Sequence, residues 1–579
     1  MNNRKAFLIS MIILLSNCIS LAQPIKIDPY NYKIKKHIVC KNGAVVSAHT
    51  LASEVGVQIL KQGGNAMDAA IATQLALAVV YPNAGNIGGG GFMVAHLKNP
   101  RRSKSFSQGE NISIDYREVA PAAAYRDMYL DSNGNPQMNL SQNGHLAVGV
   151  PGTVAGIFSC IKYSKLPFKK LIQPAINLAE NGFTITQREA DSLNNTKKKF
   201  LAVNFSATAF TKESLWKAGD TLIQKDLAKT LIRIRDNGAK GFYEGETARL
   251  IVEEMKKGNG IITEKDLKNY KTRTKAPISF NYKDYQIISM PLPGSGIILQ
   301  QMMKMIEKRN IAAMGFQTVK SVHLMTEVER RAYADRAKFL GDPDFVKVPV
   351  KTLVSEKYLN KRMHDYDPLK ANNSTDVKAG NINAESEETT HISIIDKDGN
   401  AVSITTTLNG GYGSKVVVTG AGFLLNNEMD DFSVKPGVPN MFGAVGAEAN
   451  AVFPGKRMVS SMTPTIVLNN NKPYLIVGTP GGTTITTGVF QTLVNILEFN
   501  LTAEDAVNKP KFHHQWLPDR IDVEKGFPEK VRTDLIKMGY KINDRVFTWR
   551  TELIQVLPDK KIKGVADNRG DDSAVGYKP

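Results

Sequence analysis

The sequence predicts a mixed α+β fold, because helical and strand patterns both recur along the 579 residues and the balance changes at one point. Residues 145–340 read mainly as helices, with amphipathic spacing over 200–230 and 318–336. After Glu388 the pattern turns to short strands joined by turn residues. Hydrophobic residues make up 42 % of the chain, which is enough to bury a core, so a largely disordered protein is excluded.

The amino terminus has the features of a secretory signal peptide. A basic start precedes an apolar run over residues 6–15, and Ser20-Leu21-Ala22 is a small-x-small cleavage site. The run is too short to span a bilayer. We therefore expect residues 1–22 to be removed, leaving an exported protein, periplasmic or secreted, with no stable membrane insertion. A lipoprotein cleavage before Cys18 is an alternative that the preceding Asn17 fits poorly.

Charge and cysteine content exclude several classes of protein. Lys+Arg is 74 and Asp+Glu is 55, which gives a net charge of +19. The lysines gather only in short groups without interleaved aromatic residues, which favours a basic surface over a nucleic-acid site. Three cysteines are too few for a disulfide scaffold or a cysteine-rich zinc module. Cys40 and Cys160 remain after signal removal and could pair in an oxidising compartment.

The next segment predicts two successive helices and a tight turn. Apolar residues at helical spacing predict a helix that begins near Leu51 and ends at Gly63-Gly64. Asn65, with Asp68 three positions on, predicts the cap of a second helix, and residues 66–80 are apolar on nearly every side, as in a buried helix. The glycine run at 85–91 lacks a complete phosphate-loop pattern, so we interpret it as a turn between closely packed backbones.

A polar segment, residues 366–388, runs directly into a predicted hairpin that begins with Thr389. Strands are expected over 389–396 and 401–408, joined by a Lys-Asp-Gly-Asn turn. If the chain were cut before Thr389, the new α-amine, with a pKa near ~8, would lie beside the threonine hydroxyl and could act as its base. The same pattern also describes an ordinary strand, so both readings stay open at this stage.

A second candidate lies where a strand over 474–477 leads through Gly478-Thr-Pro-Gly-Gly482 into a helix over 483–497. Free backbone N–H groups at a helix N-terminus suit an oxyanion, although a plain strand-to-helix turn has the same sequence pattern. The sequence contains no G-x-S-x-G, H-E-x-x-H or complete S-x-x-K signature. His513 and His514 are adjacent and would diverge on a strand, which favours structural histidines over a metal pair.

Motifs across nearly the whole mature chain resemble the gamma-glutamyltranspeptidase family. They include Gly64-Asn-Ala-Met-Asp-Ala-Ala70, Asn86-Ile-Gly-Gly-Gly-Gly-Phe92, Asp115-Tyr-Arg-Glu-Val-Ala-Pro121, Ala332-Tyr-Ala-Asp-Arg336, Leu340-Gly-Asp-Pro-Asp-Phe-Val346, Thr389-Thr-His391, Leu425-Asn-Asn-Glu-Met-Asp-Asp-Phe432, Pro436-Gly-Val-Pro-Asn440, Ser460-Ser-Met-Thr-Pro464 and Pro480-Gly-Gly482. The resemblance implies an N-terminal-nucleophile hydrolase, a four-layer αββα sandwich formed jointly by two chains from one self-cleaved precursor. It implies cleavage between Glu388 and Thr389, giving a large subunit (23–388) and a small subunit (389–579) that stay together as a heterodimer.

The resemblance also implies a role for individual residues. Thr389 is the implied nucleophile, Thr407 is its hydrogen-bond partner, and Gly481 and Gly482 form the implied oxyanion hole. The implied ligands of the substrate α-carboxylate are Arg117, Ser460 and Ser461, and the implied acceptors for the α-ammonium are Asn409, Glu428 and Asp431. Phe442 is the implied lid residue, at a position where many bacterial relatives carry tyrosine. A guanidinium grips a carboxylate through two parallel hydrogen bonds, which lysine cannot reproduce. No cofactor and no metal are expected.

The implied reaction cleaves γ-glutamyl amides, such as glutathione, glutathione conjugates and glutamine, through a γ-glutamyl-threonine ester. The acyl group then passes to water or to amino-acid or dipeptide acceptors. Two alternatives stay open. An acylase or poly-γ-glutamate transferase with another acyl group would have little use for Arg117 paired with Asp431, and a binding protein that never processes would not need Thr389 with the two glycines.

Overall fold

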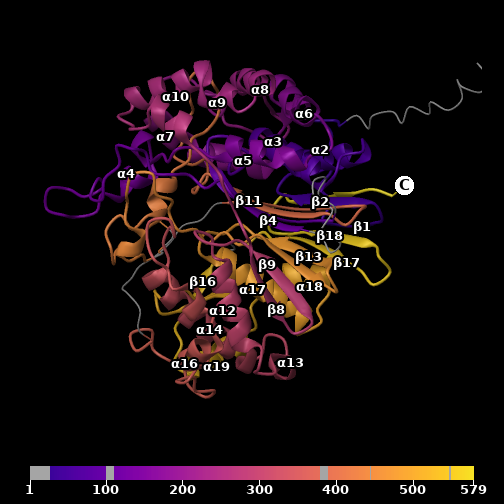
Figure 1. Ribbon diagram of the computed structural model, residues 1–579, viewed down its shortest axis with the longest axis vertical. Helices are drawn as coiled ribbons and strands as arrows, with labels where there is room; N and C mark the ends of the chain where they lie inside the picture. Colours follow the sequence, from indigo (N-terminus) through magenta and orange to yellow (C-terminus); the bar gives the residue numbers. More distant parts are fainter. Residues whose placement is uncertain are drawn as a thin grey trace, which may run out of the picture.

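Two seven-stranded antiparallel sheets lie face to face in the computed structural model, which describes residues 27–98, 110–377, 389–441, 443, 445–546 and 549–578 (Figure 1). One sheet has the order β1 (His37–Cys40), β18 (Ile562–Ala566), β17 (Glu552–Val556), β13 (Lys472–Gly478), β12 (Thr465–Asn469), β9 (Tyr285–Ser289) and β8 (Ile278–Tyr282). The other has the order β19 (Ser573–Gly576), β2 (Gly43–Ser47), β10 (Thr390–Asp396), β11 (Ala401–Thr407), β3 (Gly90–Leu97), β4 (Glu110–Asp115) and β7 (Arg273–Lys275).

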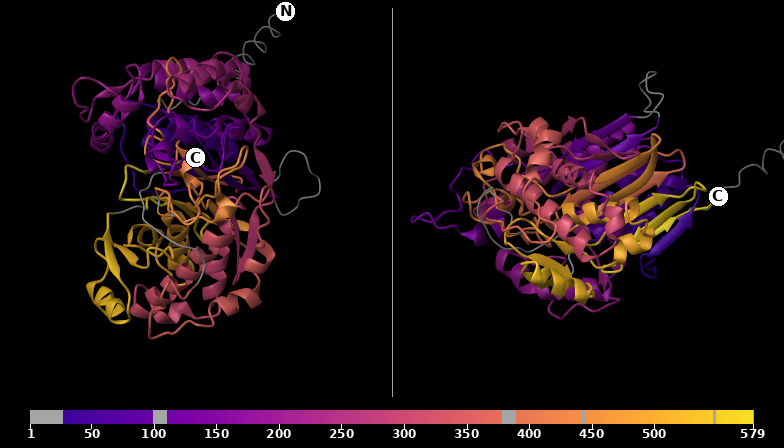
Figure 2. Two further views of the ribbon diagram at one scale, coloured as in Figure 1. Left: turned by 90° about the vertical axis from the view of Figure 1, so that its left-hand side faces the viewer. Right: turned by 90° about the horizontal axis from the view of Figure 1, so that it is seen from below.

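Helices cover the outer face of each sheet, so the layers follow the order α, β, β, α that the resemblance implied (Figures 1 and 2). Beside the β10 sheet lie α2 (Thr50–Lys61), α3 (Ala66–Val80), α5 (Thr153–Cys160), α6 (Phe168–Asn181), α8 (Lys225–Asn237) and α10 (Gly245–Lys257). Beside the β13 sheet lie α12 (Gly296–Ile306), α14 (Val319–Phe339), α17 (Thr484–Leu497), α18 (Ala503–Asn508) and α19 (Glu529–Lys537). The fold is therefore the predicted α+β sandwich.

Both faces of each sheet are buried, and neighbouring residues of one strand belong to different cores. On β2, Val45 belongs to the core beneath the helices, whereas Val46 belongs to the core between the sheets. On β9, Ile287 and Ile288 divide in the same way. Because successive side chains of a strand point to opposite faces, neighbouring apolar residues of one strand enter two different cores.

Several expected elements are confirmed. Helix α2 ends at Lys61, and α3 begins after a capping box in which Asn65 and Asp68 each accept the other's backbone N–H. All 15 residues of α3 are buried. In the glycine run, a Cβ on Gly85 would lie 2.2 Å from the Leu77 carbonyl oxygen, so this segment is the close-packed turn that was expected.

The expected amphipathic helix over residues 200–230 is wrong. Helix α7 (Gln187–Val203) ends where Asn204 bonds back to the Phe200 carbonyl oxygen, and the chain continues through turns and β6 (Thr221–Leu222) before α8 begins at Lys225. Phe210 packs against the core from a loop, not from a helix, whereas Leu201, Phe205 and Leu215 are exposed. Strands β7, β8 and β9 also interrupt the region expected to be mainly helical.

Three expectations concern residues outside those that the structure describes: the signal peptide at 1–22, Glu388 at the expected cleavage point, and Phe442 in the lid. Cys40 and Cys160 are both buried free thiols, so the disulfide considered from sequence does not form. Within the described ranges, every helix is too short or too polar to cross a bilayer.

Candidate active site

The hairpin formed by β10 and β11 places the expected nucleophile at the end of a central strand pair. The antiparallel register pairs Thr390 with Thr406, and its continuation by one residue sets Thr389 opposite Thr407. Both side chains are buried, with 4 % and 2 % of their surface exposed. The register therefore identifies Thr407 as the residue opposite Thr389, whereas residue type alone could not distinguish it from the neighbouring threonines.

The three consecutive threonines of β11 have different partners. Thr405 is hydrogen-bonded to His391 Nδ1 at 2.9 Å, and Thr406 donates to a backbone carbonyl of β3 at 2.8 Å. Thr407 Oγ1 instead accepts the backbone N–H of Asn409 at 2.8 Å. Asn409 has a φ of +76°, a conformation that asparagine tolerates better than most residues, and this bend directs the chain away from the strand.

Gly481 and Gly482 form the turn between β13 and α17, as expected. Their φ angles of +132° and +51° lie in the region that favours glycine. The carbonyl oxygens of Gly481 and Gly482 accept the N–H groups of Thr484 and Ile485, at 2.9 and 3.2 Å, and so begin the helix. The turn thus stands at the positive end of a 14-residue helix, where developing negative charge is stabilised.

The backbone of Arg117 is held firmly on both sides. Its N–H donates to Asp115 Oδ1 at 3.0 Å, and its carbonyl oxygen accepts hydrogen bonds from the Tyr270 hydroxyl at 2.8 Å and from Arg457 Nε at 3.1 Å. Arg457 also pairs with Asp115 at 3.0 Å. This buried framework fixes where the guanidinium of Arg117 can reach.

The Arg117 guanidinium is 1 % exposed and donates to two carboxylates, Glu428 through Nη1 and Asp431 through Nη2. Both acids lie on one short 3₁₀-helix, η3 (Glu428–Asp431). The next residue after the arginine, Glu118, is also fully buried, and its two carboxylate oxygens have no hydrogen-bond partner among the described residues. Arginine is thus surrounded by three acids.

Burial has the largest effect on the pKa values of the acids in this cluster. Burial raises the pKa of Glu428 and of Asp431, and the nearby Arg117 opposes the shift without cancelling it. Burial likewise raises the pKa of Glu118 to about 8. An entering ammonium group would stabilise the ionised forms of these acids, and the Arg117 guanidinium would stabilise a carboxylate, so the cluster suits a ligand that carries both groups.

Ser460 and Ser461 lie opposite this cluster on the segment that leads into β12. The Ser460 N–H donates to the Pro293 carbonyl oxygen at 2.9 Å, and the carbonyl oxygen of Ser461 accepts hydrogen bonds from Thr463 at 2.8 Å and Thr486 at 3.0 Å. The backbone of both serines is therefore positioned by neighbouring elements, and both residues line the pocket.

The segment after η3 folds back over the site. Asn440 Nδ2 donates to Asp431 Oδ1 at 3.0 Å, and the Met441 N–H donates to Asp430 Oδ2 at 2.7 Å. The Met441 sulfur lies 3.7 Å from Nδ2 of Asn409. Asn440 and Met441, which directly precede the expected lid residue in the sequence, therefore contact the site residues Asp431 and Asn409, and the sequence did not indicate these contacts.

One pocket collects most of the expected residues. It is lined by Arg117, Arg336, Thr389, Thr407, Asn409, Glu428, Asp431, Ser460, Ser461, Met462, Gly482, Thr483 and Ile485. Of the expected site residues that the structure describes, only Gly481 is not in contact with this cavity, and it adjoins Gly482 in the same turn. Arg336 was missed as a site residue, although it lies within a motif that carried the family resemblance.

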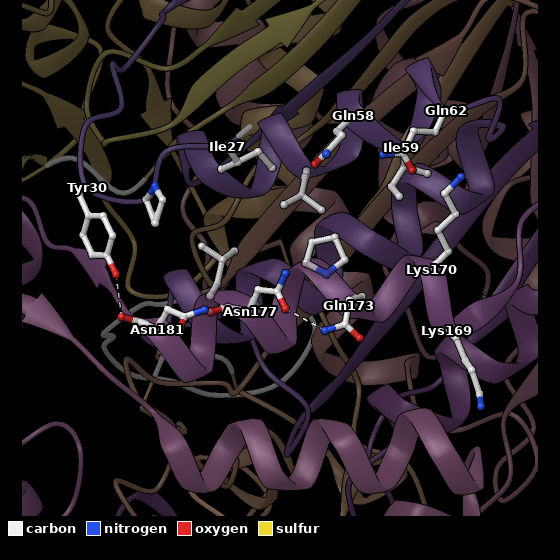
Figure 3. Close-up of a pocket in the computed structure, with 14 residues that line it drawn as sticks. Ile27, Tyr30, Gln58, Ile59, Gln62, Lys169, Lys170, Gln173, Asn177 and Asn181 are labelled. Atoms are coloured by element: carbon white, nitrogen blue, oxygen red, sulfur yellow. Dashed lines mark hydrogen bonds between the residues drawn. The ribbon is translucent and has the colours of Figure 1, made fainter. Parts of the chain in front are cut away.

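A larger pocket of about 1220 Å³ lies on the outer side of the molecule between α2, α6 and the start of the described chain (Figure 3). Its wall contains apolar and amide side chains together with Lys169 and Lys170, and the Tyr30 hydroxyl closes one side by donating to the Asn181 carbonyl oxygen at 2.9 Å. The residues that line it include no carboxylate, thiol or histidine. Size alone therefore does not identify the reactive site.

Among the described residues, no group of three or more His, Cys, Asp and Glu side chains is arranged to hold a metal ion. His513 is hydrogen-bonded to Thr487 at 2.8 Å, and His514 lies 3.2 Å from Asp519. The two adjacent histidines thus have separate structural partners.

Comparison with known proteins agrees with the pocket. A family model described as Gamma-glutamyltranspeptidase matches residues 52–577. The chain is 44 % identical over 575 residues to the glutathione hydrolase proenzyme of Escherichia coli (strain K12), which covers 98 % of each chain. It is also 44 % identical over 546 residues to the glutathione hydrolase proenzyme of Pseudomonas aeruginosa, covering 93 % of this chain and 95 % of the relative.

Solved structures share the fold. A cephalosporin acylase from Bacillus halodurans covers 96 % of this chain and is itself covered completely, with a TM-score of 0.80 at 25 % identity. The Helicobacter pylori gamma-glutamyltranspeptidase has a TM-score of 0.55 at 43 % identity, over 62 % of this chain and 97 % of the solved chain. Because the family model and the two glutathione hydrolase proenzymes extend over nearly the whole sequence, the chain belongs to the gamma-glutamyltranspeptidase family.

Proposed function

We propose that this protein is an exported, self-processing γ-glutamyltransferase and hydrolase. The observation that carries the proposal is the single pocket in which Thr389 and Thr407 meet Arg117, Asp431 and the paired serines. A threonine nucleophile, an oxyanion turn and a charged cradle are the three parts that acyl transfer from a zwitterionic donor requires. The proposed substrates are γ-glutamyl amides such as glutathione, glutathione conjugates and glutamine.

Charge supports this choice of acyl group. The guanidinium of Arg117, with the hydroxyls of Ser460 and Ser461, offers donors to an α-carboxylate. The acids Glu428 and Asp431 and the side-chain oxygen of Asn409 offer acceptors to an α-ammonium. A γ-linked glutamate carries both groups on its α-carbon, whereas an acyl group without the amine would present no ammonium to these acids.

The first chemical step is acyl transfer to the enzyme. Thr389 Oγ attacks the γ-carbonyl carbon while the α-amine of Thr389 takes the hydroxyl proton. The N–H groups of the Gly481-Gly482 turn stabilise the oxyanion. As the C–N bond breaks, the departing amine takes up the proton, and the γ-glutamyl group remains as an ester of Thr389.

The second step releases the acyl group. Water or the amine of an amino acid or dipeptide attacks the ester carbonyl, and its proton passes to the α-amine of Thr389. When the ester bond breaks, the threonine hydroxyl is restored. The products are glutamate, if water attacked, or a new γ-glutamyl amide, if an amine attacked.

An α-amine on Thr389 exists only after the chain is cut before it. The names of the bacterial relatives, proenzymes, support such a cut. The lengths support it too. The expected large subunit has 366 of 579 residues, about 63 % of the chain, and the solved Helicobacter pylori chain covers 62 %. We therefore propose subunits 23–388 and 389–579, with Glu388 and Thr389 at the cut.

The test combines processing with activity. Purified protein should give two bands on a denaturing gel, and the smaller should begin Thr-Thr-His-Ile on N-terminal sequencing. It should release glutamate from glutathione, with transfer products when a dipeptide acceptor is added. Thr389→Ala should remain one chain without activity. A single full-length band in active protein would refute the nucleophile assignment, and failure of processed protein to use any γ-glutamyl donor would refute the substrate class.

A further inference from the structure

The hydroxyls of Ser460 and Ser461 each accept a hydrogen bond from inside the protein. Arg336 Nη2 donates to Ser461 Oγ at 3.0 Å, and the Met462 backbone N–H donates to Ser460 Oγ at 3.1 Å. Within the described part of the chain, neither hydroxyl proton is used in a hydrogen bond to another residue. Both protons are therefore available to an occupant of the pocket.

These two contacts decide whether each serine hydroxyl donates or accepts toward the protein. A hydroxyl has one proton to donate and two lone pairs that accept. A guanidinium can only donate, so Ser461 must act as the acceptor toward Arg336 and keeps its proton for another partner. The backbone N–H of Met462 has the same effect on Ser460. Two hydroxyls arranged in this way match a carboxylate, which accepts hydrogen bonds and cannot donate.

Arg336 is well placed to impose this arrangement. It lies in the last turn of α14, a 21-residue helix that is buried along most of its length, and is itself 9 % exposed. One turn earlier, the Tyr333 hydroxyl donates to the Thr483 carbonyl oxygen beside the oxyanion turn. The same helix therefore anchors both Ser461 and the start of α17, and it gives Arg336 little freedom to move away.

We infer that Arg336 is a positioning residue for substrate recognition, which acts through Ser461 by committing its hydroxyl to donate toward the substrate α-carboxylate. The inference deepens the proposed function and rests on it for the identity of the ligand. Arg336 itself touches Ser461 and adds positive charge near Asp431, but the bond to the substrate is made by the serine.

The test measures recognition of the carboxylate separately from overall activity. Competitive inhibition of γ-glutamyl-p-nitroanilide turnover is compared for L-glutamate and for L-isoglutamine, in which an uncharged amide replaces the α-carboxylate. The ratio of the two inhibition constants is determined for wild type, Arg336→Met, Arg336→Lys, Ser461→Ala and Arg336→Met/Ser461→Ala. Lys338→Met is the matched control, because Lys338 is exposed on the same helix.

If the inference is right, Arg336→Met reduces the preference for glutamate over isoglutamine by about tenfold, as expected for weakening one charged hydrogen bond. Arg336→Lys restores part of the preference, and Lys338→Met leaves it unchanged. In the Ser461→Ala background, Arg336→Met changes the ratio by less than about twofold, because the residue through which it acts is already absent.

Two results would overturn the inference. One is an unchanged ratio in Arg336→Met, whatever happens to its turnover or thermal stability. The other is a loss in the double variant equal to the product of the single losses, since Arg336 would then act independently of Ser461. Failure of the proposed function is distinguishable, because the processed wild-type protein would then not turn over γ-glutamyl-p-nitroanilide at all.

Discussion

Arg117 and its two acidic partners, Glu428 and Asp431, form a buried ion cluster at the centre of the pocket. Removing one charge from such a cluster leaves the others without compensation in a dry environment, which is costly. A substrate that carries a carboxylate and an ammonium can replace these internal contacts one for one. In the proposed function, the charged residues therefore determine which acyl donor binds, while Thr389 and the glycine turn carry out the acyl transfer.

Arg117→Lys should weaken transition-state binding by about 1.5–3 kcal/mol, the range for hydrogen bonds to charged groups. Lysine keeps the charge but loses the fork of donors that now reaches two carboxylates. The measurement is kcat/KM on γ-glutamyl-p-nitroanilide, made on protein shown to be processed. An unchanged kcat/KM would remove Arg117 from substrate recognition.

The pH profile of kcat/KM should show an ascending limb that does not depend on any histidine. The α-amine of Thr389 accepts a proton only in its neutral form, so acylation becomes faster as pH rises through the pKa of that amine. Burial lowers the pKa of His391 and His513 to about 3 and that of His514 to about 4, so all three stay neutral across the assay range.

Single replacements of His391, His513 and His514 by glutamine are the controls for this profile, and Thr389→Ser should keep the limb with lower activity. Each variant must first be shown to process. A histidine variant that matures normally but loses the ascending limb would place the base elsewhere, and the N-terminal nucleophile assignment would then be wrong.

The β10–β11 hairpin is the element that creates the site. The hairpin begins directly after the expected cleavage point and lies at the centre of a sheet, with β2 on one side and β3 on the other. Helix α3 packs beneath this hairpin and contributes its wholly buried surface to the same core. Whatever stabilises α3 therefore also supports the strand that begins directly after Thr389, the proposed nucleophile.

Asn65→Ala should lower the free energy of unfolding by about 1–2 kcal/mol, because it removes the side-chain acceptor of the α3 capping box. The Asn65 side chain also donates to the Tyr163 carbonyl oxygen at 2.8 Å, so a value in the upper part of that range is expected. Asn65→Ser keeps a capping oxygen and should lose less. Chemical denaturation of the two variants in the Thr389→Ala background, which avoids the processing step, provides the comparison. Equal stability of the alanine and serine variants would show that the cap contributes nothing.

At the scale of the whole molecule, the two expected subunits interleave within both sheets. In one sheet, β10 and β11 of the small subunit lie between β2 and β3 of the large subunit. In the other, β18, β17, β13 and β12 of the small subunit lie between β1 and β9 of the large subunit. Cutting one peptide bond leaves all of these strand pairs in place.

The processed protein should therefore elute from a gel-filtration column as one species, at the same volume as uncleaved Thr389→Ala. The subunits should separate only under conditions that unfold the sheets, such as concentrated urea, because separation would expose the strand edges and the cores on both faces. Elution of a free small subunit in native buffer would contradict this arrangement.

Sequence by itself determined the elements whose pattern is set by near neighbours, and the family to which the motifs belong. The cap at Asn65, the buried helix after it and the hairpin beginning at Thr389 could all be read from residues a few positions apart. The helix predicted from apolar spacing over residues 200–230 is wrong, because Phe210 and Trp216 pack against the core from a loop.

Only the tertiary structure decided which charges and hydroxyls meet. Arg117 and Asp431 are 314 positions apart, and Arg336 and Ser461 are 125 positions apart, yet each pair is in contact. The family motifs contain all four residues but do not show the contacts, and the resemblance implied a role for Arg117, Asp431 and Ser461 but none for Arg336. The physical reason is that helices and strands follow from local periodicity, whereas contacts between distant side chains depend on how the two sheets and their covering helices pack together.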